Sequence, residues 1–286
     1  MTTRRTFLKV AAGGLTAVGA APMLRAAQRA PFGLQLYSVR RELDKDVPGT
    51  LAKVKAIGFT DVETAGFHGL TAPAFAGELK KAGLVCRSGH FEYDRFRDDP
   101  AGVVRDGQTL GAKFVACAWI PHQGKFTRQD CLRAAVDFNR WGKAAKAAGM
   151  KFFYHAHGYE FAASPDGTLF DTLMKETDPA LVFVQADIFW LTHGGANPVA
   201  LFDKYPRRWV STHLKDMAKG TPTGLTTGSA DVESNVPLGT GTIDWPSVLR
   251  AANKAGVEKH YIEDESSSVL AQIPKTLDYL RSLRLS

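Results

Sequence analysis

The chain has 286 residues, of which 44% are hydrophobic and 23% are charged, which excludes a wholly disordered protein and suits one or two domains. Its formal net charge of +7, taken alone, points to nucleic acid or to a membrane surface. However, residues 1–27 hold four basic residues and no acidic ones. Removing them leaves 32 of the 36 basic residues against 29 acidic ones, a net charge of +3. Most of the excess charge therefore belongs to the N-terminal segment and does not indicate a polyanionic partner.

The N-terminal segment has the features of an export signal. Arg4-Arg5 is followed by the mildly apolar run Val10–Pro22 and then by a region of small residues. This order predicts a twin-arginine (Tat) signal peptide over residues 1–30, with export of the mature chain, residues 31–286, to the periplasm. The alternative is a disordered tail that carries two arginines. The apolar run is shorter than the ~20 residues that span a bilayer, so we expect no stable membrane insertion.

The cysteines indicate neither a disulfide framework nor a thiolate metal site. There are three, Cys86, Cys117 and Cys131, and no two have the CxxC spacing. The first two lie in apolar, strand-like runs. We therefore expect buried free thiols.

From Phe32 onward, short apolar runs alternate with segments of helical period. Apolar residues at i, i+3 and i+4 predict helices over Val47–Ile57, Pro73–Ala82 and Cys131–Ala148. Five helical segments end in a glycine before the next strand, where the chain often needs a positive φ. These glycines are Gly58, Gly83, Gly111, Gly149 and Gly256. The predicted strands are Gly33–Tyr37, Asp61–Thr64, Val85–His90, Phe114–Trp119, Phe152–His155, Val182–Asp187, Trp209–Leu214 and His260–Glu263.

Eight strand–helix units in about 255 residues predict an α/β fold with a parallel sheet, a single (β/α)8 TIM barrel. The alternative, a doubly wound open sheet, usually carries a glycine-rich phosphate loop after an early strand. The sequence has no GxGxxG or Walker A motif there. The longest irregular segment, Met217–Thr242, has a length typical of a functional loop.

Ionisable side chains collect where the predicted strands end. In a TIM barrel these ends form the active-site face, whereas ordinary surface charge is spread over both faces. Imidazoles and carboxylates together suit a divalent ion such as Mn²⁺, Co²⁺, Zn²⁺, Fe²⁺ or Mg²⁺ with open coordination positions. The residues are Glu63, His90, His155, His157, Asp187, His213 and Glu263.

Each of these residues also has a structural interpretation. A single histidine at a strand end is more often hydrogen-bonded structure than a ligand. His155 and His157 carry more weight because residues i and i+2 face the same side of a strand, and which of them faces an ion stays open. Asp187 follows an apolar run, so it needs a partner or caps the following helix. Glu263 begins an acidic run whose mutual repulsion a cation would relieve.

Seven motifs occur in order along the barrel region. They are Val62-Glu63, Ser88-Gly89-His90, Tyr154-His155-Ala156-His157 with Glu160-Phe161, Asp187-Ile188-Phe189-Trp190, His213-Leu214-Lys215-Asp216, Gly239–Trp245 and Tyr261–Glu265. Together, from Phe32 to about Leu283, they resemble the xylose isomerase-like barrel superfamily, which includes sugar isomerases and epimerases, inosose dehydratases, endonuclease IV and 3-keto-glycoside lyases. Each motif alone is weak, and the resemblance rests on their order and spacing.

In that superfamily a divalent metal is held by groups from strands 5 to 8. The resemblance implies metal ligands at His155, Asp187, His213 and Glu263. Two positions depart from its epimerases, which usually have Glu in place of His155 and His in place of Trp190. The pair of glutamates that moves a proton in those epimerases is therefore incomplete. The pattern is closer to an exported subgroup that includes lyases of 3-keto sugars.

The chemistry that the resemblance implies is proton abstraction next to a carbonyl polarised by the ion. The candidate bases are Glu63, His157 and Glu263. Trp190 is expected to stack on a sugar face, and Lys215 to hold a hydroxyl or a developing oxyanion. The candidate substrate-binding residues are His90, Glu160, Trp190 and Lys215.

The step after proton abstraction decides the reaction. Expulsion of a β-substituent makes the protein a lyase or hydratase of keto-sugars or 3-keto-glycosides, which is the function we favour. Reprotonation makes it an isomerase or epimerase of free, non-phosphorylated sugars, since an exported enzyme meets few sugar phosphates. A third hypothesis is a non-catalytic periplasmic sugar-binding barrel.

The expected partners are a small sugar or glycoside and a companion oxidoreductase that supplies the keto substrate. A role like that of endonuclease IV is disfavoured. A net charge of +3 offers little surface for phosphates, and that family's additional His and Glu ligands have no counterparts here. We therefore expect no nucleic-acid partner.

Overall fold

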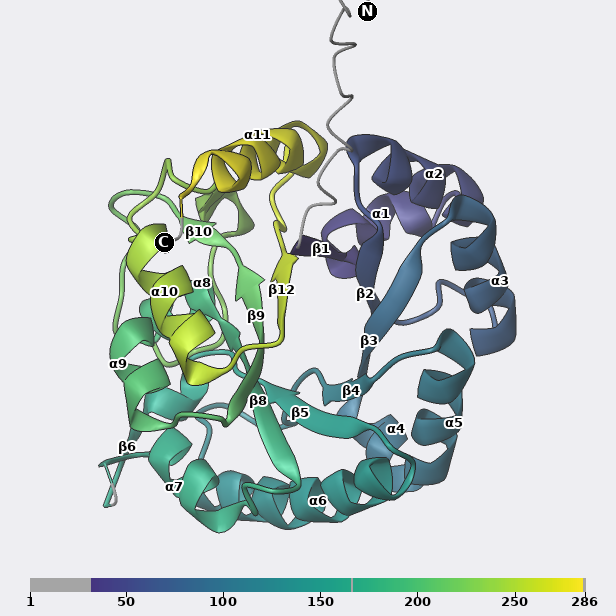
Figure 1. Ribbon diagram of the computed structural model, residues 1–286. Coiled ribbons are helices and arrows are strands. Elements are labelled where there is room, and N and C mark those ends of the chain that lie inside the picture. Colours follow the sequence, from purple (N-terminus) through teal and green to yellow (C-terminus); the bar gives the residue numbers. More distant parts are fainter. Residues whose placement is uncertain (1–31, 166, 285–286) are drawn as a thin grey trace, which may run out of the picture.

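The computed structural model describes residues 32–165 and 167–284. Eight parallel strands close into a barrel in the order β1-β12-β9-β8-β5-β4-β3-β2, and helices surround it (Figure 1). β1 pairs with β2 on one side and with β12 on the other, so the first and last units close the ring. The predicted single TIM barrel is confirmed. The predicted signal peptide, residues 1–30, lies outside the described residues.

The barrel strands agree with the predicted ones to within two residues at either end. They are β1 (Phe32–Gln35), β2 (Asp61–Ala65), β3 (Val85–Phe91), β4 (Phe114–Cys117), β5 (Lys151–His155), β8 (Val182–Asp187), β9 (Trp209–Leu214) and β12 (Lys259–Ile262). Two short hairpins lie outside the barrel: β6 (Ala163–Ser164) with β7 (Gly167–Thr168), and β10 (Asp216–Met217) with β11 (Asn235–Val236).

The helices follow the strands, and three connections between barrel strands contain more than one α-helix. The α-helices are α1 (Arg40–Leu43), α2 (Val47–Ile57), α3 (Ala72–Ala82), α4 (Tyr93–Asp98), α5 (Pro100–Leu110), α6 (Arg128–Ala147), α7 (Leu169–Glu176), α8 (Ile188–His193), α9 (Pro198–Lys204), α10 (Trp245–Ala255) and α11 (Val269–Ser282). The 3-10 helices are η1 (Leu36–Val39), η2 (Tyr159–Phe161) and η3 (Val232–Ser234). No helix among the described residues is long and apolar enough to cross a membrane.

Local sequence signals set where the helices begin and end. Thr127 and Thr168 each form a reciprocal capping box with the aspartate three residues later, at the starts of α6 and α7. The five glycines predicted at helix ends all have positive φ, between +68° and +115°. Because glycine adopts this conformation without steric cost, it can end each helix and turn the chain toward the next strand.

A small apolar cluster supports the polar end of the barrel. It contains Phe114, Ala116, Phe153 and Val210, all buried. Residues i and i+2 of a strand face the same side, so Phe153 and His155 of β5 point the same way. The ring of Phe153 also meets that of His90 edge-on, with centroids 6.0 Å apart. The polar side chains at the strand ends therefore rest on a packed apolar floor.

The long segment Met217–Thr242 is anchored to the barrel by Asp216. The carboxylate of Asp216 accepts hydrogen bonds from the backbone N–H groups of Gly239 and Gly241, at 2.8 and 3.2 Å. It also accepts one from the indole N–H of Trp245, at 2.9 Å. The segment is thus a loop that folds back beside the end of β9.

Candidate active site

The ionisable residues predicted at the strand ends meet at one end of the barrel. His155, Asp187, His213 and Glu263 each offer one ligand atom, and these atoms lie within 4.8 Å of one another. All four side chains are buried. They come from β5, β8, β9 and the residue after β12. The structure thus brings together the four residues that the family resemblance implies as metal ligands.

Several atoms of this cluster are buried without a hydrogen-bond partner among the described residues. They are Oδ2 of Asp187, Nδ1 of His213 and Oε2 of Glu263. Nδ1 of His213 lies 2.8 Å from the glutamate oxygen and 3.7 Å from the aspartate oxygen. Buried polar atoms almost always have a partner. Oxygen and nitrogen donors that converge unsatisfied on one point therefore fit a divalent cation.

The electrostatics of His213 agree with this interpretation. Burial alone would lower its pKa, but the neighbouring carboxylates of Glu263, Asp187 and Glu63 raise it well above the ordinary value. The surroundings therefore favour a positive charge at Nδ1, either a proton or a metal ion that displaces it.

Asp187 serves two purposes at once. Its Oδ1 accepts a hydrogen bond from the backbone N–H of Trp190, at 3.0 Å, and so caps the start of α8. Its Oδ2 faces the cluster, 3.7 Å from His213. The two interpretations of Asp187 from sequence are therefore compatible, one for each oxygen.

Glu63 holds His213 from behind. Its Oε1 lies 2.6 Å from Nε2 of His213 and accepts a hydrogen bond from the side-chain amide of Gln35, at 2.9 Å. Burial alone would raise the pKa of Glu63, but His90 and His213 hold it below its usual range. Because the Nε2 proton of His213 is directed to this carboxylate, Nδ1 is the nitrogen left for a cation.

Gln185 lies at the centre of the site and was not predicted from the sequence. Its Oε1 is 2.9 Å from both Nδ1 of His155 and Nε2 of His90, and its amide donates to Glu63 and Ser211, at 3.0 and 2.9 Å. An amide oxygen only accepts, so both imidazoles present an N–H to it. His155 then has its lone pair on Nε2, free to bind a cation.

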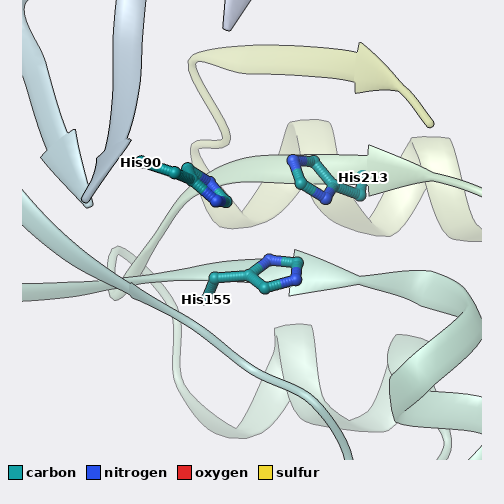
Figure 2. A group of neighbouring side chains, drawn as sticks. All are labelled: His90, His155 and His213. Atoms are coloured by element: carbon teal, nitrogen blue, oxygen red, sulfur yellow. The ribbon is translucent and has the colours of Figure 1, made fainter. Parts of the chain in front are cut away.

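His90, His155 and His213 come from three strands and lie close together (Figure 2). Their ring centroids lie 4.6 to 5.5 Å apart. One nitrogen of each ring is engaged by Gln185 or Glu63. These hydrogen bonds are sufficient to hold the three imidazole rings close together, so their arrangement does not require a metal ion bound by all three.

Lys215 lies among carboxylates, although we predicted it to bind substrate. Its Nζ is 3.7 Å from Asp187, 3.6 Å from Glu263, and hydrogen-bonded to Glu265. The ammonium also lies 5.2 Å from the centre of the Trp190 ring. Burial alone would lower its pKa, but the carboxylates raise it. This position suits a permanent positive charge that partly neutralises the site.

His157 reaches the pocket, and Glu160 supports it from behind. Nδ1 of His157 lies 3.1 Å from the backbone oxygen of His155, which places its lone pair on Nε2. Its backbone N–H donates to Glu160, at 3.1 Å. Glu160 is completely buried and also accepts from the hydroxyl of Tyr154, so it has no access to a substrate. Burial and the charge of Lys215 lower the pKa of His157 to about 3, so the ring is neutral at pH 7.

A pocket of about 580 Å³ opens above the cluster. Some of the predicted residues line its wall, and the others are buried outside it. Those in the pocket wall are His90, His155, His157, Trp190, His213 and Glu263. Those buried outside the wall are Glu63, Glu160, Asp187 and Lys215. The wall also contains aromatic residues that sequence reasoning missed, namely Tyr37, Phe67, Phe91 and Trp119. These lie at or just after strand ends, where nothing in the sequence distinguishes a pocket residue from an ordinary one.

Comparisons with known proteins find relatives over part of the chain. An inosose dehydratase of Clostridium beijerinckii is 29% identical over 140 residues, 46% of each chain, and one of Clostridium tetani is 35% identical over 92 residues, 32% of this chain and 30% of that one. The chain thus matches less than half the length of these curated relatives.

Solved structures share the fold. A sugar phosphate isomerase/epimerase from Parabacteroides distasonis has a TM-score of 0.74 at 22% identity and covers 91% of this chain and 96% of its own. The IOLI protein, solved with a bound zinc atom, has a TM-score of 0.64 at 15% identity and covers 87% of this chain and 96% of its own. The model of one protein family matches residues 51–283, which is most of the sequence. The chain therefore belongs to the xylose isomerase-like TIM barrel family.

Proposed function

We propose that the protein is a divalent-metal-dependent lyase or hydratase that acts on keto-sugars or 3-keto-glycosides. The observation that carries the proposal is the convergence of donor atoms of Asp187, His213 and Glu263 that lack hydrogen-bond partners, next to an open pocket whose wall includes His213 and Glu263. The similarity to inosose dehydratases supports it, because a dehydratase removes water by the same type of β-elimination. The zinc atom of the IOLI protein supports a metal in this fold.

The charges of the site also suit a cation. Glu63, Asp187 and Glu263 bring three buried carboxylates together, and Lys215 is the ammonium beside them. Buried charges need opposite charges nearby, so a divalent ion would offset the excess of negative charge. When bound, such an ion supplies polarisation of a substrate carbonyl and stabilises negative charge on its oxygen.

His157 is the base that we propose. It is a neutral imidazole in the pocket wall, with its Nε2 lone pair available. Its pKa of about 3 makes it a weak base, so the step requires a substrate whose carbonyl is polarised. Glu263 also reaches the wall, but its carboxylate belongs to the metal cluster. Glu63, the third predicted base, is enclosed by Gln35, Gln185 and His213, so we assign it a positioning role.

The reaction is a β-elimination. Nε2 of His157 takes the proton from the carbon next to the carbonyl, and the bond from the β-carbon to its oxygen substituent breaks. The electron pair of the C–H bond becomes the new C=C bond, and the departing oxygen takes up a proton. The products are an unsaturated ketone and an alcohol, or water in the dehydratase case. Trp190, beside His157 in the wall, offers an apolar face to the sugar ring.

The cellular setting completes the proposal. The sequence pattern of residues 1–30 supports export through the Tat pathway to the periplasm. There the substrate would be a free sugar or glycoside. A companion oxidoreductase would oxidise a sugar hydroxyl to the ketone on which this enzyme acts.

The test is an assay of the metal-loaded protein with phenyl 3-keto-glucoside and, separately, with free ketoses. We expect phenol release from the keto-glycoside, lost in Asp187→Asn and His157→Gln. Interconversion of ketoses without phenol release would replace the proposal with the isomerase or epimerase alternative. Sugar binding without any turnover would replace it with the sugar-binding barrel.

A further inference from the structure

The pocket is larger than one sugar ring requires. Its volume is about 580 Å³. A hexose has twelve heavy atoms and occupies roughly 200 Å³ at the packing density of a protein interior. If the sugar lies against the metal cluster, space remains for a second group of at least similar size.

The two ends of the pocket differ in chemistry. The end near the cluster is lined by imidazole and carboxylate groups, those of His90, His155, His213 and Glu263. The other end lies at β2, β3 and β4, and its inner wall consists of small or apolar residues. They are Ala65, Gly66, Phe67, Phe91, Ala118 and Trp119.

The aromatic rings of this second end are held in place by rings behind them. Phe67 meets Phe91 edge-on, with centroids 6.1 Å apart, and packs against Phe75 at 6.0 Å. Trp119 is stacked on His122 at 5.2 Å and meets Tyr159 edge-on at 4.6 Å. Rigid apolar surface of this kind binds an apolar ring with little loss of side-chain entropy.

The charged side chains that line this end are exposed to solvent or paired with one another. Arg95 hydrogen-bonds Asp106 at 3.1 Å and Asp99 at 3.2 Å. Glu92 is exposed to solvent. A second sugar ring would need several polar partners for its hydroxyls, whereas the side chains of this inner wall offer one polar group, the indole N–H of Trp119.

We propose that this end of the pocket is a subsite for an apolar, aromatic leaving group, so that the substrates are aryl glycosides in their keto form. We call it the aglycone subsite and define it by Ala65, Phe67, Phe91, Ala118 and Trp119. The inference rests on the proposed function, because an aglycone exists only in a glycoside. It adds the chemical class of the group that is expelled.

The experiment compares three substrates on the metal-loaded full-length enzyme: phenyl 3-keto-glucoside, methyl 3-keto-glucoside and a 3-keto-disaccharide. Phe67→Ala removes one wall of the subsite, and Ala118→Leu narrows it. Each is expected to lower kcat/KM for the phenyl substrate about tenfold more than for the methyl one. Leu70→Ala is the matched control, since Leu70 lies in the same loop, is 38% exposed and is not in the pocket wall. It is expected to change neither value.

Equal losses on the phenyl and methyl substrates would overturn the subsite, and so would a wild-type preference for the disaccharide. Direct binding of unoxidised phenyl glucoside, measured by calorimetry, separates this inference from the proposed function. If no keto-glycoside is turned over, the proposed function fails, yet binding that weakens in Phe67→Ala and not in Leu70→Ala still supports the subsite. Phenyl glucoside that binds no tighter than methyl glucoside contradicts it.

Discussion

The carboxylate of Glu63 lies 2.6 Å from Nε2 of His213 and fixes which nitrogen of that ring faces the cluster. Carboxylate–histidine pairs of this kind orient metal ligands, and their loss typically costs 10–100-fold in metal affinity. We therefore predict that Glu63→Gln lowers the affinity for Zn²⁺ or Mn²⁺ about 10- to 100-fold. Equilibrium dialysis with elemental analysis measures this. Glu78→Gln on α3, a surface residue paired with Lys81, is the control and should bind metal normally. Unchanged affinity in Glu63→Gln would remove its positioning role.

Gln185 should matter for the same reason, although it is not part of the pocket wall. In Gln185→Leu, the acceptor shared by His90 and His155 is lost, and Glu63 loses a donor. We expect weaker metal binding and a loss of about 1–3 kcal/mol in the free energy of unfolding, because buried polar groups lose partners. Urea denaturation of the metal-free protein measures the second effect. Gln108→Leu, at an exposed position of α5, should leave both quantities unchanged.

The two oxygens of Asp187 can be separated by substitution. Asp187→Asn keeps an oxygen that caps α8 but removes the charge that faces the cluster. Burial raises the pKa of Asp187, so the metal-free protein should tolerate the neutral amide. Asp187→Ala removes the cap as well, at a cost of about 1 kcal/mol in the stability of the metal-free protein. Thermal unfolding should therefore rank alanine below asparagine, while both variants lose metal binding. Equal stability of the two variants would contradict the cap.

We predict that His260 makes the free energy of unfolding decrease at acidic pH. Burial and the charge of Lys259 lower its pKa to about 4, and its Nδ1 lies 2.7 Å from Oγ1 of Thr212. An unfolded histidine has a pKa of about 6.5, so below that pH the unfolded chain binds more protons than the folded one. The contribution of neutral His260 to the free energy of unfolding is complete above about pH 6.5 and is lost as the pH falls toward about 4. Urea unfolding at several pH values measures it, and His260→Gln should make stability less dependent on pH. An unchanged slope in that variant would contradict the assignment.

The cysteines should be unreactive in the folded protein. Cys86, Cys117 and Cys131 are buried and unpaired, as predicted from the sequence, and burial raises the pKa of Cys86 and of Cys131 to about 12. The thiolate is the reactive form, so alkylation at about pH 8 should label none of the three. In urea all three should react. Mass spectrometry counts the labels, and rapid labelling of the native protein would contradict the burial of these thiols in β3, β4 and α6.

Strand positions and helix ends could be predicted from the sequence because they depend on local signals. Hydrophobic period and terminal glycines set them, and in a TIM barrel the strand ends must meet. His155, Asp187, His213 and Glu263 follow from that geometry and from the family resemblance. How deeply each side chain is buried follows from neither of them. Glu63 lies at a shift in register between β2 and β3, which no local pattern reveals, and it ends up behind the pocket wall instead of in it.

The sequence marks Gln185 as unusual but does not reveal its hydrogen-bond partners. A glutamine inside the apolar run Val182–Ala186 is unusual, and it lies two residues before Asp187, on the same face of the strand. That anomaly marks it as a site residue. Its partner Glu63 lies 122 residues away, so the hydrogen bond between them depends on how the barrel closes. The aromatic wall of the aglycone subsite depends in the same way on loops whose paths the sequence does not define.

The central claim is that four side chains at the strand ends bind one divalent ion. Calorimetric titration of the metal-free, full-length protein with Zn²⁺ and with Mn²⁺ tests it most directly. We predict one ion per chain in the wild type, with protons released on binding because the ion displaces the proton of His213. We also predict no binding in His213→Ala and normal binding in His68→Ala, a histidine on a loop outside the cluster. A wild-type protein that binds neither ion, or a His213→Ala variant that binds as tightly as the wild type, would contradict the claim.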